Sequence, residues 1–193
     1  MANIFGAKQT PALTPQAKYE MKYNASRLNL LLVVAFTAIN VIIAIFGGES
    51  YFLFSAFIPY YVAVLGALIG GKLPAEYYDE GFVADSTVFT ILTVIAIVLI
   101  ALYVVFWLLS KKKVGWLIAS LVFFVIDTIM MFALGGISIE MIVDILFHAW
   151  VIYYLVTGVM AHYKLKAIPE EPAESEPVFT VESEPEKENE VEH

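Results

Sequence analysis

Ionisable side chains inside long apolar stretches are the residues of this 193-residue chain that could do chemistry. Asp127 lies in one such stretch, and Asp144 and His148 lie in the next. An aspartate near the centre of a membrane helix costs about 2.5–3.5 kcal/mol on insertion scales, so each of these residues needs a compensating partner. Because Asp144 and His148 are four residues apart, they share one helical face, which Glu140 extends by a further turn.

Counting from an expected turn at residues 135–136 places several of these groups in one layer. Asp127 and Asp144 are both 8.5 residues from the midpoint of that turn, which in an antiparallel helical hairpin is about 13 Å below it. His148 lies one turn deeper. If the first apolar stretch ends at the same side, Asn40 reaches this layer as well. We therefore expect the two aspartates to be neighbours across the hairpin.

Two carboxylates and an imidazole at this spacing are compatible with three kinds of site. They could bind a divalent metal, hold a proton between like charges, or form part of an ion path. The alternative is structural: Asp127, Asp144 and His148 hydrogen-bond and lock the hairpin, as polar residues between membrane helices often do. No other cofactor is indicated. Residues that could assist such a site are Glu140, Pro59, Tyr60, Tyr61 and Trp150, whose mid-helix indole N–H calls for an internal partner.

The composition sets the class of protein. Hydrophobic residues make up 60% of the chain and the mean hydropathy is +0.78, against roughly 45–50% apolar residues in a soluble domain. The chain has no cysteine, which removes disulfides and thiolate chemistry. Of the net charge of −8, the acidic tail at 169–193 carries ten Glu and one Lys, so the rest of the chain is nearly neutral. The sequence predicts an all-α integral membrane protein, an antiparallel bundle of transmembrane helices with a disordered acidic tail.

A helix that crosses a bilayer needs about 20 mostly apolar residues. Four stretches satisfy this requirement: 28–46, 87–109, 114–134 and 137–160. A fifth, 51–71, is interrupted by Pro59 and several glycines, so it is either a kinked span or a re-entrant segment. The expected organisation is a basic segment at 1–27, a membrane domain at 28–166 and a disordered acidic tail at 167–193. The Thr14-Pro15 pair predicts the start of an interfacial helix within the basic segment.

The distribution of lysine and arginine favours the re-entrant path, because short cytoplasmic loops collect these residues. With four spans and a re-entrant hairpin, nine basic residues lie on one side and only Lys72 on the other. With five spans, the Lys111–Lys113 triplet moves opposite the basic N-terminus and the bias disappears. We therefore expect both termini to be cytoplasmic and residues 72–86 to be external.

Three stretches are similar in sequence to a group of small multi-pass membrane proteins of Gram-positive anaerobic bacteria. They are YFLFSAFIPYY at 51–61, SKKKVGWLIASLVFFVIDT at 110–128 and DILFHAWVIYYLVTG at 144–158. The resemblance covers about residues 28–166 and leaves out the acidic tail. It implies a bacterial plasma membrane and no particular activity.

Three functions remain open on the sequence. A transporter-like or ion-coupled protein would use the broken segment with Asp127 and Asp144, and would need to be an oligomer to enclose a pathway. A scaffold or regulator would act through its acidic tail on a cytoplasmic protein. A membrane enzyme would need a divalent metal at Asp127, Asp144 and His148. The familiar motifs of soluble enzymes and of nucleic-acid binding are absent from the sequence.

Overall fold

The computed structural model describes residues 13–48, 50–52, 54–135 and 141–169. The described part of the chain is helical, with a single short 3-10 turn, η1 (Ala75–Tyr77). The five α-helices are α1 (Pro15–Ile45), α2 (Phe57–Ile69), α3 (Ser86–Ser110), α4 (Val114–Gly135) and α5 (Ile142–Lys166). Thr14 caps α1 by accepting a hydrogen bond from the Ala17 N–H, with Pro15 in the first turn, as the sequence predicts.

Helices α1, α3, α4 and α5 are long and apolar enough to cross a membrane. The shortest of them, α4, has 22 residues, or about 33 Å at 1.5 Å per residue, against a hydrocarbon core of about 30 Å. Their outer faces carry large apolar side chains: Ile91, Val94, Val98 and Leu108 of α3 are each about half exposed. Water would penalise such a continuous apolar surface, whereas lipid does not. The all-α membrane bundle predicted from the sequence is thus confirmed.

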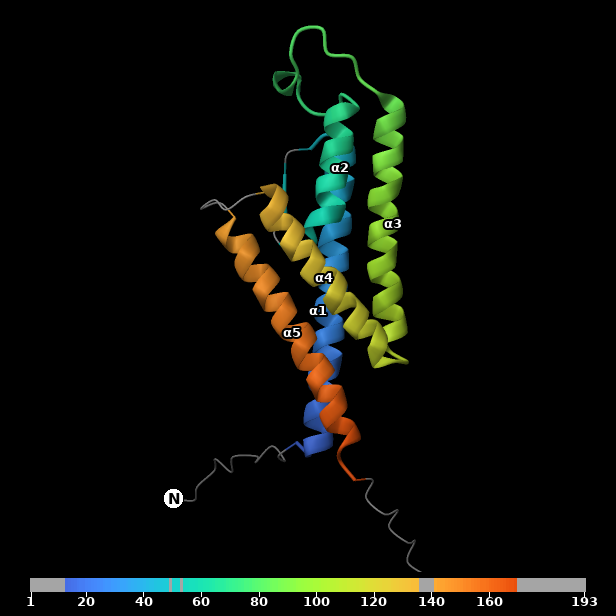
Figure 1. The fold of residues 1–193 in the computed structure, drawn as a ribbon, viewed down its shortest axis with the longest axis vertical. Coiled ribbons are helices and arrows are strands. Elements are labelled where there is room, and N and C mark those ends of the chain that lie inside the picture. Colours follow the sequence, from blue (N-terminus) through green and yellow to red (C-terminus); the bar gives the residue numbers. More distant parts are fainter. Residues whose placement is uncertain (1–12, 49, 53, 136–140, 170–193) are drawn as a thin grey trace, which may run out of the picture.

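The chain between α1 and α3 enters the bundle and leaves it at the same end (Figure 1). It turns back after α1, and α2 then starts part-way down the bundle and runs to the upper end. With 13 residues, α2 is about 20 Å long and too short to cross. Gly47 and Gly71 both have positive φ, and Gly47 lies directly against the Lys72 carbonyl. The broken segment therefore turns back within the bundle, and α2 alone is too short to be a fifth crossing.

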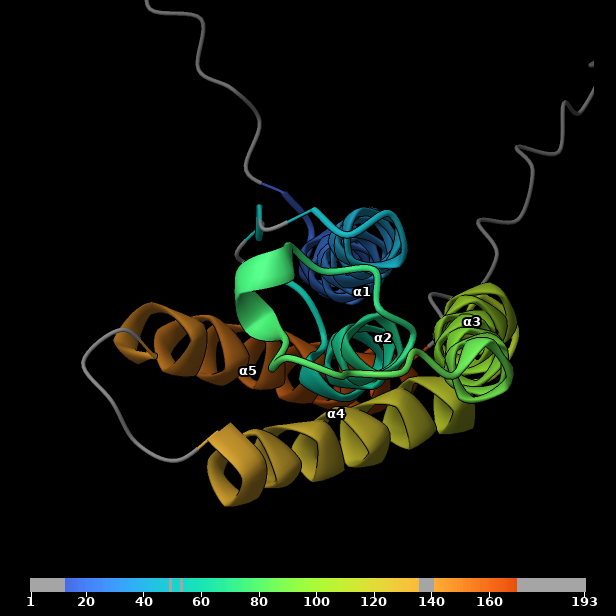
Figure 2. The ribbon, with the colours of Figure 1, turned by 90° about the horizontal axis from the view of Figure 1, so that it is seen from above.

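Small residues allow α2 to pack closely among its neighbours, α1, α3 and α4 (Figure 2). Gly66 and Gly70 are four residues apart on the face of α2 that meets α3. A Cβ atom at Gly66 would be 3.1 Å from Leu92 Cβ, and one at Gly70 would be 2.7 Å from Phe89 Cβ. In lipid, where helix association depends on van der Waals contact, this close approach fixes α2 against a membrane-crossing helix.

At the opposite end of the bundle, α1 supports the C-terminus of α3. Arg27 Nε donates to Ser110 Oγ at 2.9 Å and Arg27 Nη2 donates to the Trp107 carbonyl at 3.3 Å. The Tyr23 hydroxyl donates to the Ser110 carbonyl. A cation here is favoured by the negative end of the helix dipole and satisfies terminal carbonyl groups.

Helix α1 contributes a stripe of buried residues with helical spacing to a core that also includes buried residues of α3, α4 and α5. Its buried residues are Ser26, Asn29, Leu30, Val33, Val34, Thr37, Asn40, Val41 and Ala44. Ser26 lies directly against Gly158 of α5, where a larger residue has no space. The bounds of the last helix differ from those of the expected apolar stretch at 137–160, since α5 runs from Ile142 to Lys166. Glu140 and the acidic tail lie outside the described residues.

The re-entrant path predicts which positions share a side of the membrane. Single cysteines replacing Lys18 and Lys112 should react with an impermeant thiol reagent from the same side of sealed vesicles, and a cysteine replacing Glu80 from the opposite side. The chain has no native cysteine, so no background labelling is expected. Labelling of positions 18 and 112 from opposite sides would mean that the broken segment crosses.

Candidate functional site

The N-terminus of α2 lies inside the bundle and is capped by a side chain of another helix. The first backbone N–H groups of a helix have no intrahelical acceptor, and Ala56 at the cap position offers no side-chain oxygen. Asp127 of α4 supplies both missing acceptors: Phe57 N donates to Oδ2 at 2.7 Å and Ile58 N donates to Oδ1 at 2.8 Å. The Asp127 side chain is 1% exposed. A carboxylate is also favoured here by the positive end of the helix dipole.

His148 of α5 holds the same carboxylate. Its Nε2 lies 3.3 Å from Asp127 Oδ2, and its Nδ1 lies 2.8 Å from the Asp144 backbone carbonyl oxygen. A carbonyl oxygen can only accept, so Nδ1 carries a hydrogen. For the 3.3 Å contact between Nε2 and Oδ2 to be a hydrogen bond, one of these two atoms must carry a hydrogen as well. The imidazole ring also stacks on Phe124, with ring centroids 4.9 Å apart.

Two polar residues of α1 bind the extended backbone that precedes α2. Asn40 accepts from Phe52 N at 2.8 Å and donates to the Phe52 carbonyl at 2.6 Å and to Ser55 Oγ at 2.9 Å. Thr37 Oγ1 accepts from Ala56 N at 2.8 Å and donates to the Val33 carbonyl at 2.6 Å. Non-helical backbone at membrane depth is tolerated only where protein satisfies its polar groups. These side chains therefore stabilise the break in the helix.

The predicted pairing of Asp127 with Asp144 does not describe the contacts found. Asp127 binds the start of α2 and His148, whereas the Asp144 carboxylate binds the Tyr51 hydroxyl. The counting argument assumed a turn at residues 135–136. Because α4 ends at 135 and α5 begins at 142, the midpoint moves to 138.5, and the position level with Asp127 becomes 150, close to His148. The side chain found beside Asp127 is that of His148 and not that of Asp144.

The proposed metal-ligand set is not assembled. Among the described residues, no three His, Cys, Asp or Glu side chains are grouped closely enough to hold a metal ion. The backbone N–H groups of α2 already occupy both Asp127 oxygens, and one imidazole nitrogen faces a carbonyl. The donor set around Asp127 thus fits a helix cap and not a divalent metal.

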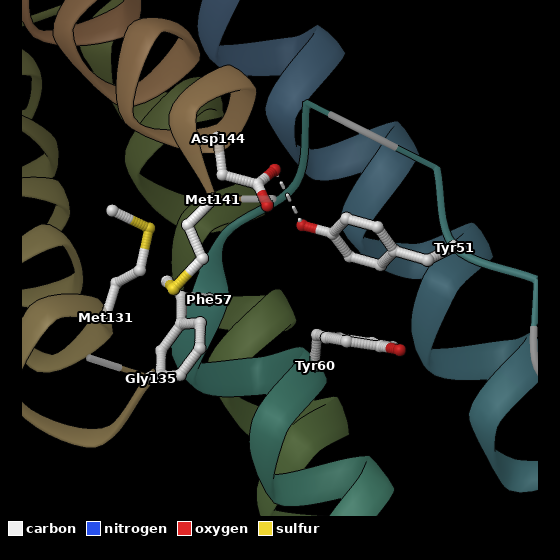
Figure 3. A pocket seen from close by; sticks show the side chains of 7 residues that line it. All are labelled: Tyr51, Phe57, Tyr60, Met131, Gly135, Met141 and Asp144. Carbon is white, nitrogen blue, oxygen red and sulfur yellow. Dashed lines mark hydrogen bonds between the residues drawn. The ribbon is translucent and has the colours of Figure 1, made fainter. Parts of the chain in front are cut away.

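Asp144 instead borders a cavity of about 310 Å³ between the re-entrant segment and the ends of α4 and α5 (Figure 3). The cavity is lined by Tyr51, Phe57, Tyr60, Met131, Gly135, Met141 and Asp144. The Tyr51 hydroxyl donates to Asp144 Oδ1 at 3.1 Å, and Ser55 Oγ lies 3.4 Å from that hydroxyl. Asp144 is partly exposed and lies in the first turn of α5, where the helix dipole favours a negative charge.

The residues predicted to assist the site do not lie together in the structure. Pro59 is the third residue of α2, where its missing N–H has no intrahelical role, so it starts a helix and does not kink one. Tyr60 borders the cavity. Tyr61 stacks on Phe57 with ring centroids 5.3 Å apart. Trp150 was expected to point inward, but its side chain is 40% exposed and packs against Tyr154 on the outer side of α5.

Sequence reasoning missed three residues that bind the re-entrant segment or the cavity carboxylate: Thr37, Ser55 and Tyr51. Thr37 donates to the Val33 carbonyl of its own helix and also accepts from Ala56 N. It lies three residues before Asn40 on the same face of α1, and that spacing is a signal that could have identified it. Nothing in the local sequence indicates that Tyr51 reaches Asp144, 93 residues away.

Comparisons with known proteins do not supply a function. The chain matches no family model, no curated protein and no solved structure. The functional argument therefore rests on the helix cap and the adjoining cavity.

Removing the Asp127 cap should lower the stability of the protein strongly, whereas removing the Asp144 carboxylate should lower it only slightly. We expect Asp127→Ala to lower the free energy of unfolding by about 2–5 kcal/mol, because it leaves two buried N–H groups and His148 without partners. Asp127→Asn keeps one side-chain acceptor, so its free energy of unfolding should lie between those of Asp127→Ala and the native protein. Asp144→Asn should cost less than about 1 kcal/mol, since its bond to Tyr51 is at the protein surface.

Unfolding titrations in detergent would measure these differences. The Asp127 and Asp144 effects should add, because the two side chains have separate partners. Equal losses for Asp127→Ala and Asp144→Asn would contradict the assignment of the cap.

Proposed function

We propose that this integral membrane protein is transporter-like and that its substrate site is the cavity beside the start of α2. The observation that supports this proposal is a helix that begins inside the bundle next to a cavity with a partly exposed carboxylate. Discontinuous helices of this kind form the substrate and ion sites of many secondary transporters. In this chain the cap is permanently supplied by Asp127, so the ligand binds at the neighbouring cavity and not at the helix terminus.

The two sets of polar residues have different tasks in this proposal. Asp127, His148, Asn40 and Thr37 hold the re-entrant backbone in place and keep their hydrogen bonds throughout the cycle. Asp144 is partly exposed and its carboxylate bonds a single tyrosine hydroxyl, so it is the group that binds the substrate or exchanges the coupling ion. Movement of α4 and α5 relative to α2 would change access to the cavity that lies between them.

The setting follows from the charge distribution and the sequence resemblance. The protein is placed in a bacterial plasma membrane with both termini cytoplasmic, because the basic residues then lie almost entirely inside. In this orientation the cavity lies in the outer half of the bilayer. Four crossing helices are few to enclose a pathway, so the transporter acts as a homo-oligomer.

The other two functions have less support. A scaffold acting through its acidic tail on a cytoplasmic partner depends on residues 170–193, which lie outside the described part of the chain. Truncation after Ile168 would test that function. A metal-dependent membrane enzyme lacks its ligand set among the described residues.

Transport requires that the cavity be reached from both sides of the membrane. Single cysteines replacing Tyr60 of α2 and Met141 at the start of α5, which both border the cavity, should react with a small impermeant thiol reagent from either side of sealed vesicles. At each position, the labelling rate from one side should rise and the rate from the other side should fall as the protein shifts from one state to the other. Quenched-flow labelling followed by mass spectrometry would measure both rates.

Two control positions define the limits of this assay. A cysteine replacing Glu80, in the loop beyond α2, should react from one side only. A cysteine replacing Ile129, which is 59% exposed on the apolar face of α4, should not react with a hydrophilic reagent. Reaction of the cavity positions from one side alone under all conditions would contradict transport and leave a one-sided binding site.

A further inference from the structure

We infer that the cavity at Tyr51, Tyr60 and Asp144 binds an organic cation, a protonated amine or quaternary ammonium group on a small apolar body. The inference deepens the proposed function and rests on its placing of the substrate in this cavity. Binding itself does not require transport, so the two can fail separately.

The first argument is the charge of Asp144. The single ion pair within the described part of the chain joins His148 and Asp127, so the Asp144 carboxylate has no cationic partner there. The neighbouring segment 136–140 contains no Lys, Arg or His. A carboxylate has about four acceptor positions, and the Tyr51 hydroxyl uses one of them. The remaining positions call for a positively charged donor in a largely apolar cavity.

The second argument is the aromatic wall beside that carboxylate. The rings of Tyr51 and Tyr60 lie 4.8 Å apart at 43°, and Phe57 borders the same cavity (Figure 3). The faces of such rings attract cations, and the attraction is stronger when the cation is desolvated. Aromatic faces together with one carboxylate are the chemistry that recognises ammonium groups and not anions.

The third argument concerns the body of the ligand. The rest of the lining is apolar and includes Met131 and Met141, whose flexible thioethers adapt to different shapes. An inorganic divalent cation needs several oxygen ligands, whereas the described residues that line the cavity offer one carboxylate and the tyrosine hydroxyls. At about 310 Å³, the cavity lies at the small end of the roughly 300–1,000 Å³ found for ligand sites. A small aryl- or alkylammonium ion fits these limits.

Benzyltrimethylammonium is a suitable probe because it has a neutral isostere of the same shape, neopentylbenzene. Radiolabelled benzyltrimethylammonium would be equilibrated with the full chain in nanodiscs of phosphatidylglycerol. We expect saturable binding that unlabelled benzyltrimethylammonium displaces at least about tenfold more effectively than neopentylbenzene, corresponding to about 1.4 kcal/mol. Equal displacement by the two compounds would overturn the inference, because the site would then recognise shape without charge.

Variants locate the binding at the cavity. Asp144→Asn should weaken binding by at least about tenfold, and Tyr60→Leu by about three- to tenfold. Gly135→Leu should also weaken it, because a side chain at this position points towards Met141 and Phe57 and fills the cavity while leaving the carboxylate. Glu80→Gln removes a charge from the loop beyond α2 and should leave affinity unchanged. Unfolding titrations would confirm that each variant is folded.

Unchanged affinity in folded Asp144→Asn protein would overturn the inference.

The ammonium group could belong to a free amine or to a lipid headgroup, and a second experiment distinguishes these sources. If phosphatidylcholine in the nanodisc competes with the probe, a lipid headgroup is the ligand; if it does not, a free amine is. Probe binding with one-sided cysteine labelling would support the cation site and contradict transport. Two-sided labelling without probe binding would do the reverse.

Discussion

Backbone N–H and C=O groups inside a bilayer must find partners within the protein, and this requirement governs the centre of the molecule. The chain breaks its helical structure after α1 and starts α2 inside the bundle, which exposes several amides that no helix satisfies. Asp127 accepts two of them, Asn40 pairs with both polar groups of Phe52, and Thr37 accepts a fourth. Without these bonds a re-entrant path would be too costly.

The same requirement separates the structural polar residues from the one available for chemistry. Asp127 is buried and each of its oxygens has a backbone donor, while its second partner, His148, is itself oriented by a backbone carbonyl. Asp144 is partly exposed and its side chain bonds a single tyrosine hydroxyl beside a cavity. Both residues cost free energy in an apolar stretch, but for different reasons. Asp127 binds the backbone of α2, whereas Asp144 borders the cavity.

Much of the fold could be predicted from the sequence because it depends on local patterns and on charge. Span lengths, the Thr14-Pro15 helix start and the break around Pro59 all follow from properties of a few adjacent residues. The lysine distribution favoured a re-entrant path. Glycines at 47 and 71, both with positive φ, mark its two ends.

The partners within the site could not be predicted, since they depend on the geometry of connections. The predicted pairing of Asp127 with Asp144 depended on a two-residue turn, and a longer connection moved His148 into that place. Nothing in the local sequence reveals that the Ala56 N–H lies within reach of Thr37. The bond between Tyr51 and Asp144 joins residues 93 positions apart. Trp150 was expected inside, yet an aromatic side chain is equally stable facing lipid.

Amide hydrogen exchange at Phe57 and Ile58 tests the central claim most directly, which is that the Asp127 carboxylate caps a helix starting inside the bundle. First-turn amides of an uncapped helix lack acceptors and exchange rapidly when water reaches them. By NMR in lipid nanodiscs, both amides should be strongly protected in the native protein. In Asp127→Ala they should lose that protection while amides in the last turns of α2 retain theirs. Equal protection in both proteins, or rapid exchange in the native one, would contradict the account.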